Sequence, residues 1–200
     1  MVQLFESFSG DVSANDFKAA VWLGQTFTPQ VTHDLTSVKL KLYRVGGAGG
    51  QIGSVYSAIR AVDGDHKPTG ASLVTSNAIT ATTITTSSPG ELYEFVFNSS
   101  HRLLIDVEYA IIAYTTGGDS SNFIQGRYNN SGGYARGLGW RSSDSGSTWS
   151  AHGDWAFEEW GNLYVPVATI GKINKVGTGS IAKFNRINLS SMKKLRKILL

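Results

Sequence analysis

Val38-Lys-Leu-Lys-Leu-Tyr43 alternates apolar and polar side chains with a period of two residues. Successive side chains of a β-strand point to opposite faces, so this stretch predicts a half-buried strand. Stretches rich in β-branched and aromatic residues recur around it, at 55–62, 92–97, 109–114, 123–128 and 163–167. Clusters of Gly, Pro, Asn and Asp separate them and predict turns. The pattern favours an all-β, antiparallel sandwich or barrel, with Ser13–Ala20 as a short helical candidate.

The chain has 200 residues and no cysteine, enough for one domain with a core and an appendage. We expect an N-terminal arm at 1–20, the sandwich at 21–168 and a tail at 169–200. The four histidines show no ligand spacing, so we expect no metal and no cofactor. The first ten residues do not read as a secretory signal, and no apolar run is long enough to span a membrane. The expected site of synthesis and assembly is a cytoplasm.

The tail repeats an apolar, basic unit every eleven positions, at Ile170–Val176, Ile181–Ile187 and Met192–Ile198. A unit this short cannot bury its apolar face alone, so the repeat predicts a docking or oligomerisation device. The positions expected to carry docking are apolar: Ile173, Val176, Ile181, Phe184, Ile187 and Leu195.

Charge is distributed unevenly along the chain. Eight of the 18 Lys and Arg residues lie after position 170, whereas all 15 Asp and Glu residues lie before position 160. The rest of the chain therefore carries ten positive and fifteen negative groups, a net charge of about −5. A basic tail of this kind fits an acidic protein partner, an anionic surface or nucleic acid.

Aromatic residues crowd the second half of the chain, where aromatic faces could stack on sugar rings and polar neighbours could orient them. The candidate carbohydrate-binding residues are Trp140, Tyr134, Tyr128, Asp119, Asn122 and Arg127. Trp140 and Tyr134 are the first choices, because Gly-rich neighbours place them at loop ends. The alternative is that most of these aromatic residues belong to the sandwich core.

Ser142–Trp149 matches the Asp-box pattern, Ser/Thr-x-Asp-x-Gly-x-Thr/Ser-aromatic. The pattern predicts a hairpin turn in which Asp144 caps backbone N–H groups, Gly146 takes a positive φ and Trp149 packs beneath. Sialidases, which this motif resembles, repeat the box around a propeller. A single copy in a short chain favours a structural role.

Catalytic signatures are absent from the sequence. Gly46–Gly50 lacks the Gly-Lys-Ser/Thr end of a phosphate-binding loop. The adjacent Glu158 and Glu159 should point to opposite faces of a strand and cannot act as a paired acid and base. We therefore expect a protein that is not an enzyme.

Five stretches of core and turn residues carry a family resemblance: Gly24–Pro29, Leu35–Gly46, Ile59–Gly64, Pro68–Gly70 and Tyr109–Tyr114. Together they resemble jelly-roll sandwiches of the carbohydrate-binding-module type, which occur in bacterial surface proteins and phage virion proteins. The resemblance implies an antiparallel jelly-roll β-sandwich.

The tail units are similar to the short Ile-x-Lys-Ile/Val-Asn-Gly-Val repeats near the ends of many phage structural proteins. They depart from that form after the Asn, where Lys175 and Arg186 replace Gly, and the third unit has Arg196 in place of Asn.

A glycan-binding-type sandwich joined to a docking tail predicts a non-enzymatic phage virion structural protein: a head or tail fibre, decoration or baseplate-associated protein. Its expected partners are other virion proteins, copies of itself and a host-surface glycan. One alternative is a bacterial surface carbohydrate-binding or adhesion module. A less favoured one is a nucleic-acid-associated protein using the basic tail, which would bind DNA with a steep salt dependence.

Overall fold

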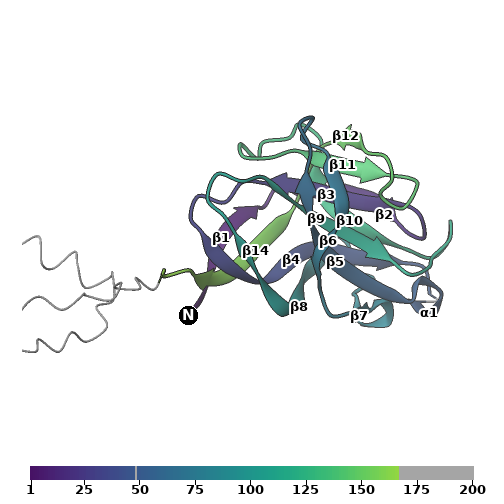
Figure 1. Ribbon diagram of the computed structural model, residues 1–200. Coiled ribbons are helices and arrows are strands. Elements are labelled where there is room, and N and C mark those ends of the chain that lie inside the picture. Colours follow the sequence, from purple (N-terminus) through teal and green to yellow (C-terminus); the bar gives the residue numbers. More distant parts are fainter. Residues whose placement is uncertain (48, 167–200) are drawn as a thin grey trace, which may run out of the picture. The chain divides into compact units, whose positions relative to one another are not determined.

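A computed structural model describes residues 1–47 and 49–166 of the chain (Figure 1). Within them, Met1–Leu163 form one compact unit. Its strands are β1 (Val2–Phe8), β2 (Ser13–Phe17), β3 (Trp22–Phe27), β4 (His33–Val45), β5 (Ser54–Val62), β6 (Pro68–Thr75), β7 (Ile79–Thr80), β8 (Glu91–Leu103), β9 (Tyr109–Thr115), β10 (Phe123–Asn129), β11 (Gly139–Ser142), β12 (Ser150–His152), β13 (Asp154–Trp155) and β14 (Phe157–Leu163). A single helical turn, α1 (Gly49–Ile52), and a 3-10 turn at Ala81–Thr83 complete the described elements.

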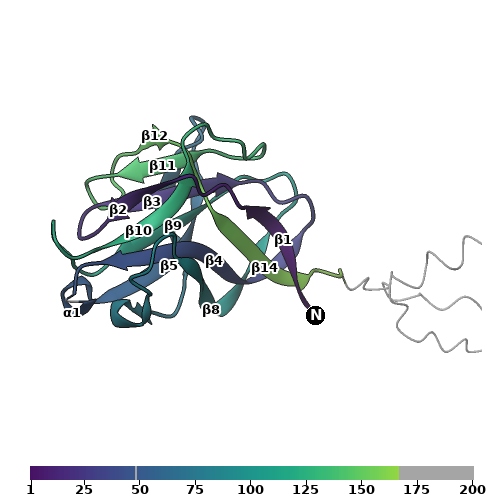
Figure 2. The ribbon, with the colours of Figure 1, turned by 180° about the vertical axis from the view of Figure 1, so that it is seen from behind.

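The strands form two antiparallel sheets, which Figures 1 and 2 show from opposite sides. The first sheet has the order β1-β14-β4-β10-β13, with β2 paired to β10 and β8 paired to β4. The second has the order β12-β11-β3-β9-β5-β6, with β7 paired to β5. The chain passes repeatedly from one sheet to the other, for example from β3 to β4 to β5. The expected all-β, antiparallel sandwich is confirmed.

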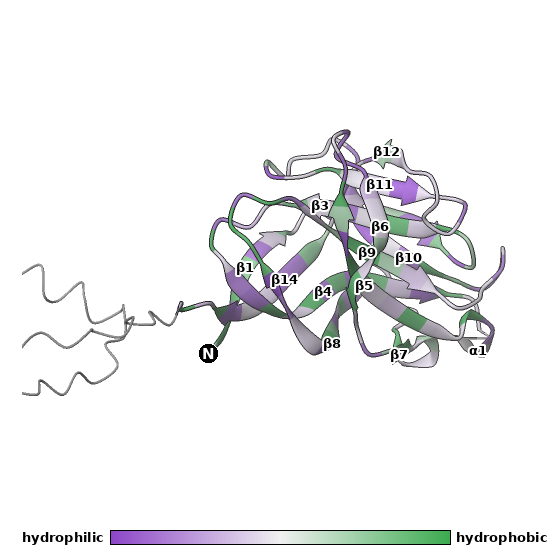
Figure 3. Ribbon diagram, viewed as in Figure 1, coloured by the Kyte–Doolittle hydropathy of each residue, from purple (hydrophilic) through white to green (hydrophobic). Residues whose placement is uncertain are grey.

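The alternation along β4 is confirmed as well. Val38, Leu40 and Leu42 are buried between the sheets, whereas Lys39 and Lys41 lie on the outer face. Figure 3 shows the resulting bands of high and low hydropathy along the strands. The buried side of β4 packs with apolar residues of both sheets, and apolar burial between two sheets is the main favourable contribution to the folding of a sandwich.

The N-terminal segment differs from expectation. Val2–Phe8 and Ser13–Phe17 are strands of the first sheet, so residues 1–20 are not a separate arm and the helical candidate at 13–20 is wrong. β2 owes its conformation to pairing with β10, more than a hundred residues further along the chain. Local sequence carries no signal for that pairing. In β1, the partners of Leu4 and Glu6 are consecutive residues of β14, so Phe5 is an extra, bulged residue.

The Asp-box turn joins β11 to β12 as predicted. The Asp144 carboxylate accepts hydrogen bonds from the backbone N–H groups of Ser147 (3.1 Å) and Thr148 (2.8 Å). It also accepts the hydroxyls of Thr148 (2.6 Å) and Ser142 (2.7 Å). The Thr148 bonds, followed by that of Ser142, lower the pKa of Asp144 to about 2. The carboxylate is therefore ionised at neutral and mildly acidic pH, where it caps the turn.

Gly146→Val is expected to destabilise the protein by about 1–3 kcal/mol. Gly146 has a φ of +78°, and a Cβ at this position would lie 2.7 Å from the Trp22 ring and 3.0 Å from the Arg60 guanidinium. Gly64→Val is the matched control, because nothing lies within 4 Å of a Cβ there. Urea unfolding of both variants measures the difference. Equal stability of the two would show that the turn does not need glycine.

The tail at 169–200, with all six docking positions predicted in it, lies outside the described residues. Its role stays a prediction from the sequence.

Candidate ligand-binding face

Trp140 and Tyr134, the first choices for sugar stacking, are buried: only 5% of Trp140 and 8% of Tyr134 is exposed. Trp140 packs with Trp149 and Ile112 on the outer face of the second sheet. Tyr134 lies in the main core, with its ring edge-on to Phe157 at 5.2 Å. The expectation that these two rings are exposed at loop ends is wrong, because each is covered by neighbouring aromatic side chains.

The other four predicted residues do not converge on one site. Asp119 accepts the backbone N–H groups of Ser121 and Asn122 and so caps the loop that precedes β10. Arg127, further along β10, donates to the carbonyl oxygen of Asp11. Tyr128 follows it and packs against Trp155, with ring centroids 5.0 Å apart. These four residues are close in the sequence because they follow one another along a loop and β10, and they do not line a common pocket.

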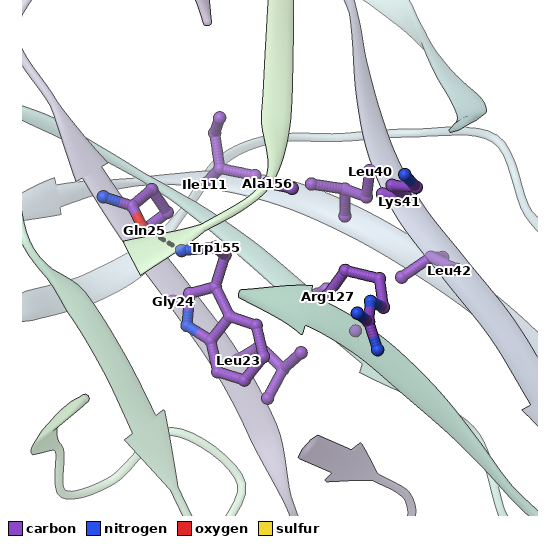
Figure 4. Close-up of a pocket in the computed structure, with 12 residues that line it drawn as sticks. Leu23, Gly24, Gln25, Leu40, Lys41, Leu42, Ile111, Arg127, Trp155 and Ala156 are labelled. Carbon is purple, nitrogen blue, oxygen red and sulfur yellow. Dashed lines mark hydrogen bonds between the residues drawn. The ribbon is translucent and has the colours of Figure 1, made fainter. Parts of the chain in front are cut away.

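Arg127 does reach a cavity, but the cavity is interior. It lies between the sheets, has a volume of about 20 Å³ and is lined mainly by apolar groups such as Leu23 and Leu40 (Figure 4). Beside it, the backbone N–H of Trp155 donates to the Gln25 side chain at 2.7 Å, as the dashed line in Figure 4 marks. A space of this size holds about one water molecule. It is therefore no site for an organic ligand.

A different set of residues forms a polar ladder on the outer face of the first sheet. The cross-strand register aligns Ser7 of β1, Glu158 of β14, Lys39 of β4 and Glu94 of β8 in one row. Lys39 Nζ lies 3.6 Å from a Glu158 oxygen. Glu94 accepts the hydroxyl of Ser37 at 2.7 Å. Negative, positive and negative groups thus alternate across three neighbouring strands, and we call this surface the ladder face.

Trp160 is the aromatic residue of the ladder face. It lies in the next row, opposite Leu4 on one side and Ser37 on the other, and it is half-buried. Its indole N–H donates to Glu158 at 2.8 Å, and Lys39 Nζ lies 4.4 Å from the centre of its ring. These two contacts fix the ring on the sheet surface.

A groove borders the ladder at β1 and β8. It has a volume of about 190 Å³. Phe8 and Leu92 supply apolar lining, and Ser7, Lys41 and Glu158 supply polar groups. Pockets that enclose a drug-sized ligand usually have about 300–1,000 Å³, so this groove can hold part of a larger ligand. Apolar walls with a few polar groups are what a sugar or another amphipathic ring requires.

The outer face of the second sheet is aromatic too, but its rings contact one another. Trp22, Tyr114 and Tyr56 stack across three strands, with centroids 4.7 Å and 5.4 Å apart. Arg60 lies over the Trp22 ring at 5.1 Å, and the Asp-box turn packs against the same ring. This row stabilises the turn, so we assign it a structural role.

Beneath the ladder face lies a buried acidic pair. Glu6 and Glu159 are cross-strand partners, with exposed fractions of 1% and 0%. His33 binds Glu159 at 2.9 Å, and Tyr134 donates to Glu6 at 2.8 Å. Arg136 also donates to Glu6. One oxygen of each carboxylate has no hydrogen-bond partner.

The pKa values of this cluster are shifted by burial and by neighbouring charges. Burial and the nearby Glu6 raise the pKa of Glu159, although His33 lowers it. Burial alone lowers the pKa of His33, but the hydrogen bond and charge of Glu159 outweigh it and the net shift is upward. Both pKa values are thus raised, which favours retention of a proton by His33 and Glu159.

The sequence could have located Trp160. Glu158 and Glu159 were expected on opposite faces, and their burial confirms it. Because side chains alternate along a strand, Trp160 lies on the same face as Glu158. Pairing of this strand with Val38–Tyr43 then brings Trp160 beside Lys39. The sequence did not indicate that these two strands pair with each other.

Comparison with family models, with curated proteins and with solved structures gives no match. No group of three or more His, Cys, Asp or Glu side chains within the described ranges could hold a metal ion. No helix in that part of the chain is long and apolar enough to cross a membrane. A proposal for the function has to rest on the geometry of the ladder face and on the sequence of the tail.

Proposed function

We propose that this chain is a non-enzymatic phage virion structural protein, whose sandwich binds a host-surface glycan through the ladder face and whose tail docks it on the particle. The observation that supports glycan binding is Trp160, a half-buried indole fixed by Lys39 and Glu158 beside a polar row. A sugar ring has an apolar face and a hydroxyl rim. The indole can stack on the apolar face, and the alternating carboxylates and ammonium group can form hydrogen bonds with the hydroxyl groups.

The virion assignment rests on the sequence, because it depends on the basic, apolar tail and on the resemblance described above. A bacterial surface adhesin would use the same ladder face, so the two proposals differ in the partner of the tail and not in the ligand. Binding of DNA that weakens steeply with salt would favour the nucleic-acid alternative instead.

Trp160→Ala is expected to remove binding on an array of bacterial surface glycans while the protein remains folded. The stacking surface is lost, but the ring is only half-buried, so the core is retained. Tyr56→Ala is the matched control: it removes a half-buried aromatic ring from the outer face of the other sheet. Loss of signal in both variants, or in the control alone, would contradict the assignment to the ladder face. Absence of signal from the unaltered protein would contradict glycan binding by the sandwich.

A further inference from the structure

One end of the sandwich is apolar. β1 begins there and β14 ends there, and the loops from β3 to β4 and from β8 to β9 close it. This follows from the strand register, in which Val2 pairs with Asn162 and His33 pairs with both Leu103 and Leu163. Figure 1 shows the N-terminus and the end of β14 together at this end. Six exposed apolar side chains belong to these segments, each 41–51% exposed: Val2, Val31, Leu104, Ile105, Val107 and Leu163. We call this surface the apolar end.

The concentration of apolar groups at this place is unusual. Single exposed apolar residues are normal on a protein surface, whereas a gathered patch marks an interaction site. Six of the fourteen large apolar side chains exposed in the described part of the chain lie at this one end. The loops that carry them are tied together, because the Ile105 N–H donates to Thr32 and the Asp106 N–H donates to Pro29.

Two ion pairs lie beside the patch. Arg102 binds Asp34 at 2.9 Å, and His66 binds Glu108 at 2.6 Å. Both pairs involve the strands and loops that border the apolar end, and both are solvent-exposed. An apolar centre with a polar, ion-paired border is the usual composition of a protein interface.

We infer that the apolar end packs against the same end of a second copy of this chain. The remaining chain, from residue 164 to residue 200, follows directly from Leu163 in this patch. Its eleven-residue apolar repeat is predicted to associate with other copies, and tails that associate bring the ends from which they start close together. The inference therefore rests on the docking role proposed for the tail. Apolar ends held at a high effective concentration need little affinity of their own to pack.

The chain contains no cysteine, so a single introduced thiol reports contact between copies. The full-length Ile105→Cys variant, treated with a short bis-maleimide, is expected to give a covalent dimer. Val12→Cys is the control, because Val12 is well exposed and lies in the connection that follows the opposite end of β1. Cross-linking of Ile105→Cys at no more than the control level would overturn the inference.

Sedimentation equilibrium of the full chain provides the second measurement. Ile105→Glu combined with Val107→Glu is expected to weaken self-association at least tenfold. Leu92→Glu combined with Val96→Glu, which alters similarly exposed side chains on β8, should leave it unchanged. A monomeric wild-type protein, or equal association of both double variants, would contradict the inference and indicate another occupant of the patch. Glycan binding by the Ile105→Glu, Val107→Glu variant is measured as well. If it survives, a failure of the self-association inference leaves the proposed glycan binding at the ladder face intact.

Discussion

Replacing His33 with Ala is expected to destabilise the protein by about 3–5 kcal/mol. The imidazole is fully buried, its Nε2 lies 2.9 Å from a Glu159 carboxylate oxygen, and its ring stacks on Phe5 with ring centroids 3.7 Å apart. Removing one partner of a buried ion pair leaves the other charge without compensation, and that penalty is the main cost. Urea unfolding at pH 6 measures it. A loss below about 1 kcal/mol would mean that Glu159 is not charged in the folded protein.

The double variant His33→Leu with Glu159→Leu is the control. It removes both charges at once, so its stability should lie closer to the wild type than that of His33→Ala. If the double variant is as unstable as the single one, packing and not charge explains the loss.

The pH dependence of stability gives a further check on the same pair. The folded-state pKa of His33 is raised above 6.5, so its contribution is fully present below pH 6.5 and is lost as the pH rises through the folded pKa. Wild-type stability should therefore decline on the alkaline side of pH 6.5, and in His33→Ala the part of that decline that comes from the imidazole should be absent.

Phe184→Asp combined with Ile187→Asp is expected to abolish self-association or particle docking, even at low salt. Burying apolar side chains of this size contributes about 1.5–3 kcal/mol each, and both occupy matched positions of the repeat. Sedimentation equilibrium, or incorporation into particles, measures the effect.

The basic residues of the same unit supply the control. Lys183→Gln with Arg186→Gln should leave association largely intact, because exposed charges contribute little beyond steering. The reverse pattern, with association lost only when the charges are removed, would favour an anionic partner such as nucleic acid.

The sequence predicted the features that local chemistry determines. The period of two at Val38–Tyr43 depends only on strand geometry. The Asp-box turn depends on a carboxylate, a glycine and a hydroxyl within eight residues, and the structure shows both the expected Asp144 caps and the positive φ of Gly146, while the ring that lies against Gly146 is Trp22. Both predictions required no knowledge of which segments pair.

The candidate site could not be predicted in the same way, because it is made by pairing across the chain. Trp160, Lys39 and Glu94 meet only when β14, β4 and β8 are neighbours. Gly-rich neighbours predicted a loop end for Trp140, but the residue lies on β11, and both faces of the second sheet carry apolar clusters. Alternation along one strand cannot tell which of two apolar faces is covered.

The bulged Phe5 and the buried Glu6 make β1 a poor template for further strands. β1 is the edge of its sheet, and an edge with open N–H and C=O groups invites strand addition from other molecules. A bulge breaks the regular spacing of those groups, and an inward-pointing charge penalises any register that would move it. Copies of the sandwich can therefore lie close together and meet through side chains without their sheets fusing into a continuous aggregate.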